Sequence, residues 1–301
     1  MGEDWLEHQL TPAEAASFAR DGYFIVPDAL LAKEVERLAD AVERVRDLVA
    51  RAHGVPRTDS FNLIDFMGLD QAFIDLVDHP TTFPKLWTIL GWNMQIYHSH
   101  LIVTPSLQAP DTRRRKHFLQ SQRPRSARSD TVASDEDWWG WHRDSGQING
   151  DLGDGLQPRL SVKIAYYLSD ALGDTDANMW VAPGSHVDAD VQAGAAYAKK
   201  PPPGATPVRT AAGSAVFFDR RIVHSSSPNF GSHTRKVLFY GYSHRWVRPR
   251  DDMTVGAYLA RSDPIRRQLL GHSESAFGYS SPGVDDVPLR SWLEERGISI
   301  R

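Results

Sequence analysis

Hydrophobic residues at helical spacing mark the first third of the chain. Apolar positions recur every three or four residues between Leu31 and Gly54, which predicts an amphipathic helix. A shorter helix is predicted over residues 11–22, because Thr11 and Glu14 can form a capping box at its start. We therefore expect residues 1–93 to be mainly helical and to support the rest of the fold.

From about residue 94 the pattern changes to that of strands. Residues 94–103 and 159–168 are rich in β-branched and aromatic side chains and are bounded by Pro, Gly and Asp. Later apolar runs are short and separated by turn-forming residues, which is typical of an antiparallel sandwich or closed barrel. We expect one domain over residues 1–301, mainly β with flanking helices. Its strand core is predicted at 94–248 and its C-terminal helices at 249–301.

One segment within the predicted core differs from its surroundings. Residues 105–137 contain few apolar side chains, and their basic residues come before a short acidic run. A loop of this length is either a solvated insertion or a functional element. The functional interpretation is a lid over a pocket, and deleting residues 113–128 should then impair substrate turnover.

Composition and charge narrow the classes of function. The chain has no cysteine, which excludes disulfides, thiolate catalysis and cysteine metal sites, so a metal must bind His, Asp or Glu. Its formal net charge of -4 gives no basic field for nucleic acid or an anionic membrane. No apolar run approaches the roughly 20 residues of a membrane span, and the first residues do not form a signal peptide. A cytoplasmic protein with a small-molecule partner is expected, and its oligomeric state is left open.

His-x-Asp is the most informative metal-ligand pattern in the chain. Side chains at positions i and i+2 of an extended segment point the same way and can reach one metal ion. Two such pairs and one His-x-Glu pair occur, and a chance match among 12 histidines is expected. The three pairs are His142 with Asp144, His186 with Asp188, and His272 with Glu274.

Context favours the first pair. His224 lies 82 residues after His142, at the end of an apolar strand, which leaves room for several strands before the chain returns to the same pocket. Two histidines and one carboxylate on one face suit a non-haem Fe(II) oxygenase. Arg235 follows at the start of another strand, and residues 225–234 are expected to form a hairpin that places it beside His224. A buried guanidinium needs an anion, and its planar shape matches a carboxylate.

The sequence resembles the phytanoyl-CoA dioxygenase family of Fe(II)- and 2-oxoglutarate-dependent oxygenases. The resemblance implies a double-stranded β-helix, a jelly-roll or cupin-like barrel. It also implies iron on His142, Asp144 and His224, with 2-oxoglutarate and dioxygen as the other cofactors. The segments that carry the resemblance are Leu10–Tyr23, Tyr97–Leu101, Trp141–Asp144, Val181–His186 and His224–Arg235.

The resemblance also assigns roles around the iron. Arg235 and the Ser226 hydroxyl are expected to hold the distal carboxylate of 2-oxoglutarate.

Trp139 is expected to form a wall of the site and is grouped with Arg235 and Ser226 as a cofactor-binding residue, whereas Trp141 is expected in the core. His98 and His100 are expected to line the barrel or to donate hydrogen bonds around the metal ligands rather than to bind a metal themselves.

A carboxylate at position 144 favours hydroxylation over halogenation, since halogenases of this family carry Gly or Ala there. The expected activity is therefore hydroxylation of an unactivated C–H bond in a small-molecule metabolite or natural product. Desaturation, ring closure and epimerisation remain open from the same chemistry. Two alternatives are a zinc or manganese cupin-type isomerase or hydrolase, in which Arg235 has no obvious task, and a non-catalytic binding barrel.

Overall fold

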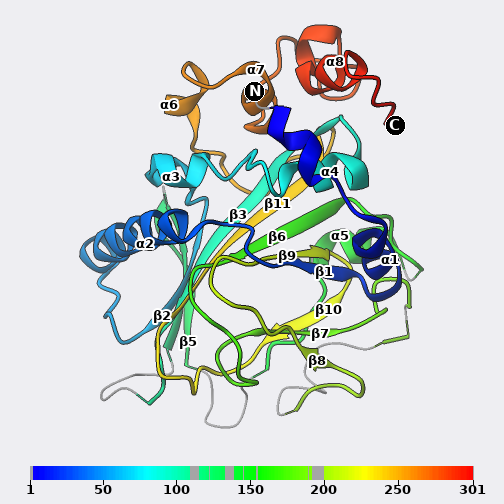
Figure 1. Ribbon diagram of the computed structural model, residues 1–301. Helices are drawn as coiled ribbons and strands as arrows, with labels where there is room; N and C mark the ends of the chain where they lie inside the picture. The colour runs from blue at the N-terminus through cyan, green and yellow to red at the C-terminus, as the bar shows by residue number, and fades with distance from the viewer. Residues whose placement is uncertain are drawn as a thin grey trace.

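Two β-sheets form the centre of the molecule (Figure 1). The computed structural model describes residues 3–108, 115–121, 123–132, 139–144, 146–153, 155–188, 190–191 and 200–300. In this part of the chain the larger sheet has eight strands in the order β1-β9-β6-β11-β3-β2-β4-β5, and the smaller has three in the order β10-β7-β8. The strands are β1 (Tyr23–Val26), β2 (Ser60–Ile64), β3 (Met94–Thr104), β4 (Arg115–Gln120), β5 (Arg123–Val132), β6 (Ser161–Tyr167), β7 (Met179–Ala182), β8 (Thr206–Pro207), β9 (Ala215–Asp219), β10 (Val223–Ser226) and β11 (Arg235–His244).

The two sheets pack face to face. Neighbouring strands in both sheets are antiparallel, apart from the parallel pair β2 and β4. One buried cluster combines Val216, Phe218 and Val237 of the larger sheet with Met179 and Val181 of the smaller sheet. This arrangement confirms the expected double-stranded β-helix fold.

Helices cover the outer face of the larger sheet (Figure 1). The first helix begins as predicted: the Glu14 backbone N–H donates to Thr11 Oγ1 at 3.2 Å, and the Thr11 N–H donates to the Glu14 carboxylate at 2.9 Å. The α-helices are α1 (Pro12–Asp21), α2 (Ala32–His53), α3 (Gln71–Ile74), α4 (Phe83–Leu90), α5 (Gly146–Asp151), α6 (Gly256–Leu259), α7 (Pro264–Leu269) and α8 (Pro288–Glu294). The 3-10 helices in the described residues are η1 (Glu3–His8), η2 (Met67–Leu69) and η4 (Val284–Asp286).

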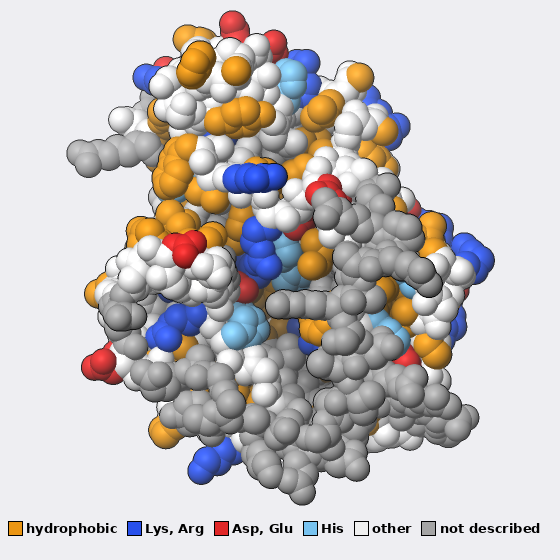
Figure 2. Space-filling model, turned by 180° about the vertical axis from the view of Figure 1, so that it is seen from behind, with side chains coloured by type: hydrophobic (Ala, Val, Ile, Leu, Met, Phe, Trp, Pro, Cys, Tyr) orange, Lys and Arg blue, Asp and Glu red, His pale blue; other side chains and the backbone are white. Residues whose placement is uncertain are grey.

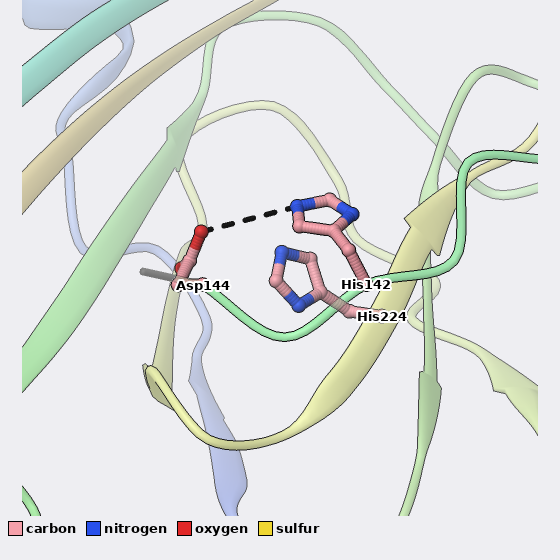
Figure 3. A group of neighbouring side chains, drawn as sticks. All are labelled: His142, Asp144 and His224. Atoms are coloured by element: carbon pink, nitrogen blue, oxygen red, sulfur yellow. Dashed lines mark ion pairs between the residues drawn. The ribbon is translucent and has the colours of Figure 1, made fainter. Parts of the chain in front are cut away.

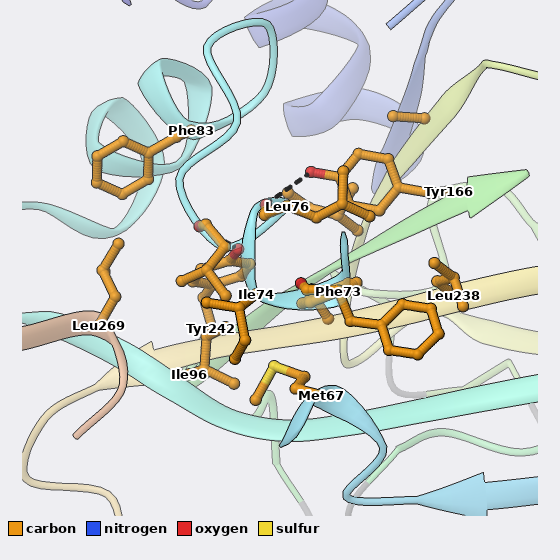
Figure 4. Packing of buried hydrophobic residues seen from close by; sticks show 14 of the residues in the cluster. Met67, Phe73, Ile74, Leu76, Phe83, Ile96, Tyr166, Leu238, Tyr242 and Leu269 are labelled. Atoms are coloured by element: carbon orange, nitrogen blue, oxygen red, sulfur yellow. Dashed lines mark hydrogen bonds between the residues drawn. The ribbon is translucent and has the colours of Figure 1, made fainter. Parts of the chain in front are cut away.

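The largest core lies between these helices and the sheet. Phe73 and Leu76 pack with Tyr166, Leu238 and Tyr242 from the sheet (Figure 4). The Tyr242 hydroxyl donates to the Val77 carbonyl at 2.7 Å, so its one polar group is satisfied inside the core. This packing holds β6 and β11 rigidly from behind and leaves their opposite faces for the site.

The segment 105–137 is not the simple loop that its composition suggested. Its described part contains β4 and β5, and β4 extends the larger sheet by parallel pairing with β2. Residues 109–114, 122 and 133–138, which include the acidic run 135–137 and the first two residues of the basic run, lie outside the described residues. The lid therefore stays a prediction, but β4 is a fixed part of the sheet.

The predicted hairpin at 225–234 is wrong. β10 pairs with β7 in the smaller sheet, whereas β11 pairs with β3 and β6 in the larger one. The connection crosses between the sheets and is held by the Asn229 side chain, which donates to the carbonyls of Thr104 and His233 at 2.8 and 2.9 Å. Arg235 therefore enters the fold through the larger sheet and not as a strand partner of His224.

None of the helices in the described ranges is long and apolar enough to cross a membrane.

Candidate metal centre

Three side chains come together between the two sheets. One nitrogen each of His142 and His224 and one oxygen of Asp144 all lie within 4.8 Å of one another (Figure 3). His224 projects from β10, while His142 and Asp144 come from the extended segment that precedes α5. The sequence-predicted metal ligands therefore converge, as their spacing indicated.

Backbone pairing joins the two histidines across 82 residues of sequence. The His142 N–H donates to the His224 carbonyl and the His224 N–H donates to the His142 carbonyl, each at 3.0 Å. The ring centroids are 4.3 Å apart as a result. The Asp144 N–H donates to the Arg220 carbonyl at 3.0 Å, which ties the carboxylate to the turn before β10.

Both imidazoles are oriented by a backbone carbonyl. Nδ1 of His142 lies 2.6 Å from the Gly140 carbonyl, and Nδ1 of His224 lies 3.0 Å from the Ile222 carbonyl. A carbonyl can only accept, so Nδ1 carries the proton in each ring and Nε2 keeps its lone pair. Burial lowers the pKa of His224 to about 3, which keeps its ring neutral. Both rings thus present Nε2 in the form that binds metals.

The third ligand is a buried carboxylate with a cation behind it. Lys163, on β6, places Nζ 2.8 Å from Oδ2 of Asp144, while Oδ1 faces Nε2 of His142 at 3.9 Å. Burial alone would raise the pKa of Asp144, but Lys163 foremost holds it well below its usual value. Asp144 is therefore ionised, with Oδ1 turned to the histidines and Oδ2 occupied.

Arg235 is a buried cation that forms no ion pair with the described residues. It is 1% exposed, and within the described residues none of its three guanidinium nitrogens has a hydrogen-bond partner. The guanidinium lies 5.3 Å from the Tyr167 ring centroid and 6.0 Å from that of Phe239. Burial, and then the nearby Arg235, lower the pKa of Lys116 on β4. Because Arg235 is buried and is repelled by Lys116, an anionic ligand that binds near both of them would be stabilised.

Ser226 and Trp139 differ in how they relate to the site. Ser226 lies two residues after His224 on β10, so its side chain shares the face of the strand that carries the metal ligand. Trp139 stacks on Trp141 at 5.6 Å and meets the edge of Trp180 at 5.3 Å. It is not among the residues that line the cavity beside the metal ligands. Contacts of Ser226 and Trp139 with a cosubstrate stay predictions.

A cavity of about 640 Å³ adjoins the metal ligands, a volume suited to a small organic molecule. Seen from behind, basic and histidine side chains gather in a hollow at the centre of this face (Figure 2). Strands β2, β3 and β4 form one wall and the segment with the metal ligands forms another. The cavity is lined by Asn62, Ile64, His98, His100, Phe118, Leu119, Gln120, His142, Arg143, Asp144, Gly146, Lys163 and Arg250.

The other candidate metal pairs have different surroundings. His186 is buried, and its Nε2 lies 3.2 Å from the Ala19 carbonyl at the end of α1. His272 and Glu274 form a surface pair at 3.1 Å. Among the described residues, neither pair joins a third ligand in a metal-sized cluster.

Sequence reasoning missed Lys163 and Arg250 in this cavity and Lys116 near Arg235. Lys163 had a visible signal, because it interrupts the otherwise apolar strand β6. Lys116 and Arg250 had none, since each lies in a polar stretch of sequence.

The sequence matches the family model for phytanoyl-CoA dioxygenase (PhyH) over residues 18–237. The match covers most of the chain and includes all three metal-ligand candidates and Arg235. The chain therefore belongs to the phytanoyl-CoA dioxygenase family of Fe(II)- and 2-oxoglutarate-dependent oxygenases. No curated protein matches it in sequence.

Solved structures share the fold at low sequence identity. HygX from Streptomyces hygroscopicus, with nickel and 2-oxoglutarate bound, has a TM-score of 0.57 and 15% identity over 78% of this chain and 87% of that chain. The alpha ketoglutarate dependent carbocyclase SnoK from nogalamycin biosynthesis has a TM-score of 0.53 and 18% identity over 85% of this chain and 92% of that chain. The epimerase SnoN from the same biosynthesis has a TM-score of 0.51 and 20% identity over 77% of this chain and 80% of that chain. These likenesses support the fold assignment.

Proposed function

We propose that this protein is an Fe(II)- and 2-oxoglutarate-dependent dioxygenase that hydroxylates an unactivated C–H bond of a small-molecule metabolite or natural product. Family membership supports the cofactors, and the arrangement of buried charges supports their placement. The observation that carries the proposal is the convergence of His142, Asp144 and His224 beside a cavity. The larger sheet, which forms one wall of that cavity, also holds Arg235, which has no hydrogen-bond partner among the described residues.

The three ligand groups fit Fe(II). Two neutral imidazoles and one carboxylate form the ligand set that non-haem iron oxygenases use, and no thiolate competes for a softer metal. Lys163 neutralises Oδ2, which favours binding through Oδ1 alone. The carbonyls of Gly140 and Ile222 fix both rings before the metal arrives.

Arg235 fits the distal carboxylate of 2-oxoglutarate. A guanidinium that is 1% exposed and unpaired within the described chain is costly until an anion binds it. A bidentate carboxylate satisfies two of its nitrogens, and Lys116 adds positive potential nearby. Ser226 is proposed to donate its hydroxyl to the same carboxylate.

Bound Fe(II) and 2-oxoglutarate supply the oxidising chemistry, in which dioxygen is activated as 2-oxoglutarate becomes succinate and carbon dioxide. The protein's part is to hold both and to position one C–H bond of the substrate beside them. Asp144 occupies the carboxylate position, which favours hydroxylation over halogenation. SnoK and SnoN are named a carbocyclase and an epimerase, so product analysis must decide between hydroxylation and these outcomes.

An anaerobic titration tests the proposal. Adding Fe(II) and 2-oxoglutarate to the metal-free protein should give a weak visible charge-transfer band, and His224→Ala should abolish it. A compound library screened in air for stimulated succinate release should then identify the substrate. Absence of the band, together with turnover supported by zinc or manganese alone, would establish the isomerase or hydrolase instead. Ligand uptake without succinate in air would indicate a binding protein.

A further inference from the structure

A buried carboxylate and two histidines form a hydrogen-bonded chain that ends at the cavity. Asp251 Oδ1 lies 2.6 Å from His98 Nδ1, and His98 Nε2 lies 2.8 Å from His100 Nδ1. The other oxygen of Asp251 accepts from the backbone N–H and the hydroxyl of Ser99. His98 is 2% exposed and Asp251 is 6% exposed, so the chain is shielded from solvent up to His100.

The carboxylate sets the direction of every hydrogen bond in this chain. Asp251 can only accept, so His98 carries its proton on Nδ1. Burial lowers the pKa of His98 despite Asp251, so the ring is neutral and its Nε2 is an acceptor. His100 must then donate from Nδ1. Burial, and then Lys163, lower the pKa of His100 well below its usual value, which leaves its Nε2 without a proton.

This Nε2 is the free end of the chain. His100 lines the cavity beside the metal ligands, and within the described residues the only hydrogen bond of its side chain is the one from Nδ1 to His98. The Phe239 ring packs against the imidazole with a centroid separation of 4.4 Å and limits its rotation. A fixed acceptor in a cavity selects for a donor on whatever fills that cavity.

The charges of the cavity indicate what kind of donor it is. Among its described lining residues, Arg143, Lys163 and Arg250 are cationic and Asp144 is the acid, already paired with Lys163. Arg143 donates to backbone carbonyls, and the Arg250 side chain has no ion pair or hydrogen bond within the described chain. A substrate ammonium group would be repelled here, whereas a neutral hydroxyl would not.

We propose that His100 determines substrate specificity by accepting, at Nε2, a hydrogen bond from a hydroxyl group of the substrate. Asp251 fixes the polarity of this contact through His98 and acts as a positioning residue. The substrate class is a hydroxyl-bearing small molecule without an ammonium group near the metal. The inference rests on the proposed function in one respect, namely that this cavity is the substrate site.

Nitrogen NMR on zinc-loaded protein with 2-oxoglutarate, labelled with ¹⁵N at histidine, tests the tautomer directly. Loss of signals in His100→Gln assigns that ring. We expect Nδ1 of His100 to be protonated and Nε2 unprotonated. Phenol, added as a small hydroxyl donor, should then move the Nε2 resonance upfield, and its methyl ether anisole should not.

Three results would overturn the proposal: a protonated Nε2, an equal response to phenol and anisole, or no response to phenol at saturation. Asp251→Asn should produce a mixture of His100 tautomers, because an amide no longer imposes one direction. Ser99→Ala is the matched control, since it removes one contact to Asp251 and leaves His98 in place. An unchanged His100 tautomer in Asp251→Asn would show that Asp251 is not a positioning residue. If that variant does not fold, the tautomer and the phenol response of the wild-type protein still test the proposal.

The iron site and the His100 contact are tested by independent measurements. The charge-transfer titration reports on iron and 2-oxoglutarate and does not involve His100. The tautomer and the phenol response do not require turnover. If the charge-transfer band is absent but His100 has the expected tautomer and phenol response, the His100 contact stands and the oxygenase assignment is wrong.

Discussion

Lys163 holds Oδ2 of Asp144 at 2.8 Å, with both side chains buried against the cavity. The ion pair does two things at once. It keeps the carboxylate ionised, and it leaves Oδ1 as the oxygen that faces the histidines. Lys163 therefore helps to prepare the metal site without being a ligand.

Lys163→Met should weaken Fe(II) binding by about 10- to 100-fold, the usual loss when a partner of a metal ligand is removed. The thioether fills the space but leaves a buried carboxylate uncompensated. Anaerobic equilibrium titration measures the effect. Lys85→Met is a suitable control, because Lys85 pairs with Glu14 at 2.8 Å outside the cavity and should leave metal affinity unchanged.

Replacing either histidine ligand should abolish metal binding. His142→Ala or His224→Ala leaves two ligands, too few for a stable Fe(II) site. Metal content after dialysis and the charge-transfer band both report the loss. His272→Ala alters the His-x-Glu pair at the surface and should retain full binding. Retention of metal by His224→Ala would show that the ion sits elsewhere.

Arg235→Met should have opposite effects with and without cosubstrate. In the ligand-free protein it removes a buried charge that no described residue pairs with, so stability should rise by about 1 kcal/mol or more, roughly 2–4 °C in Tm. With Fe(II) present, 2-oxoglutarate affinity should fall by about 2–4 kcal/mol, and the stabilisation that 2-oxoglutarate gives the wild type should disappear. Thermal melts with and without 2-oxoglutarate measure both.

The control for this variant is Arg245→Gln. Arg245 is also buried, but it donates to the carbonyls of Gly278 and His272. Its loss should lower Tm and leave 2-oxoglutarate affinity intact. A lower Tm in ligand-free Arg235→Met would mean that Arg235 has a structural partner.

Asp219 gives a pH-dependent contribution to stability. It ends β9 and accepts hydrogen bonds from Arg221 and Arg159 at 2.7–2.9 Å. Burial opposes ionisation, but the hydrogen bond from Arg221 holds the pKa of Asp219 below its usual value. A carboxyl with a depressed folded-state pKa stabilises the fold above its unfolded value near ~4 and loses that contribution as pH falls through the folded pKa.

Asp219→Asn should therefore cost about 3 kcal/mol at neutral pH and progressively less below pH ~4. Urea unfolding across that range measures the difference. Asp174→Asn removes a pair with Arg209 in which both side chains are 53% exposed, so it should change stability little at any pH. A cost for Asp219→Asn that does not depend on pH would point to packing rather than charge.

The sequence predicted the ligands better than their surroundings. His142 and Asp144 share a local spacing rule, and His224 follows an apolar run, so the ligand set could be found without coordinates. The run is not the single predicted strand, because β9 ends at Asp219 and His224 is the second residue of β10. Pairing between His98 and Asp251 could not, because 153 residues separate them and no local pattern links their positions. His98 and His100 both line the cavity, in agreement with the prediction that they line the barrel.

Two errors have the same physical origin. The spacing from His224 to Arg235 fits a hairpin, but the choice of sheet depends on long-range partners such as β3 and β7. The polar composition of β4 and β5 suggested a loop. Both lie at one end of the larger sheet, and strands at a sheet edge can form with few apolar residues. Local periodicity carries information about burial and little about which strands become neighbours.

Strand β4, which pairs in parallel with β2, brings to the cavity a stretch of chain that carries none of the three metal ligands. Phe118, Leu119 and Gln120 of β4 line the cavity, whereas the ligands come from the smaller sheet and the segment before α5. Substitutions along β4 can therefore alter which molecule is accepted while the metal stays in place. A single scaffold of this kind can acquire new substrates by changing one strand at its margin.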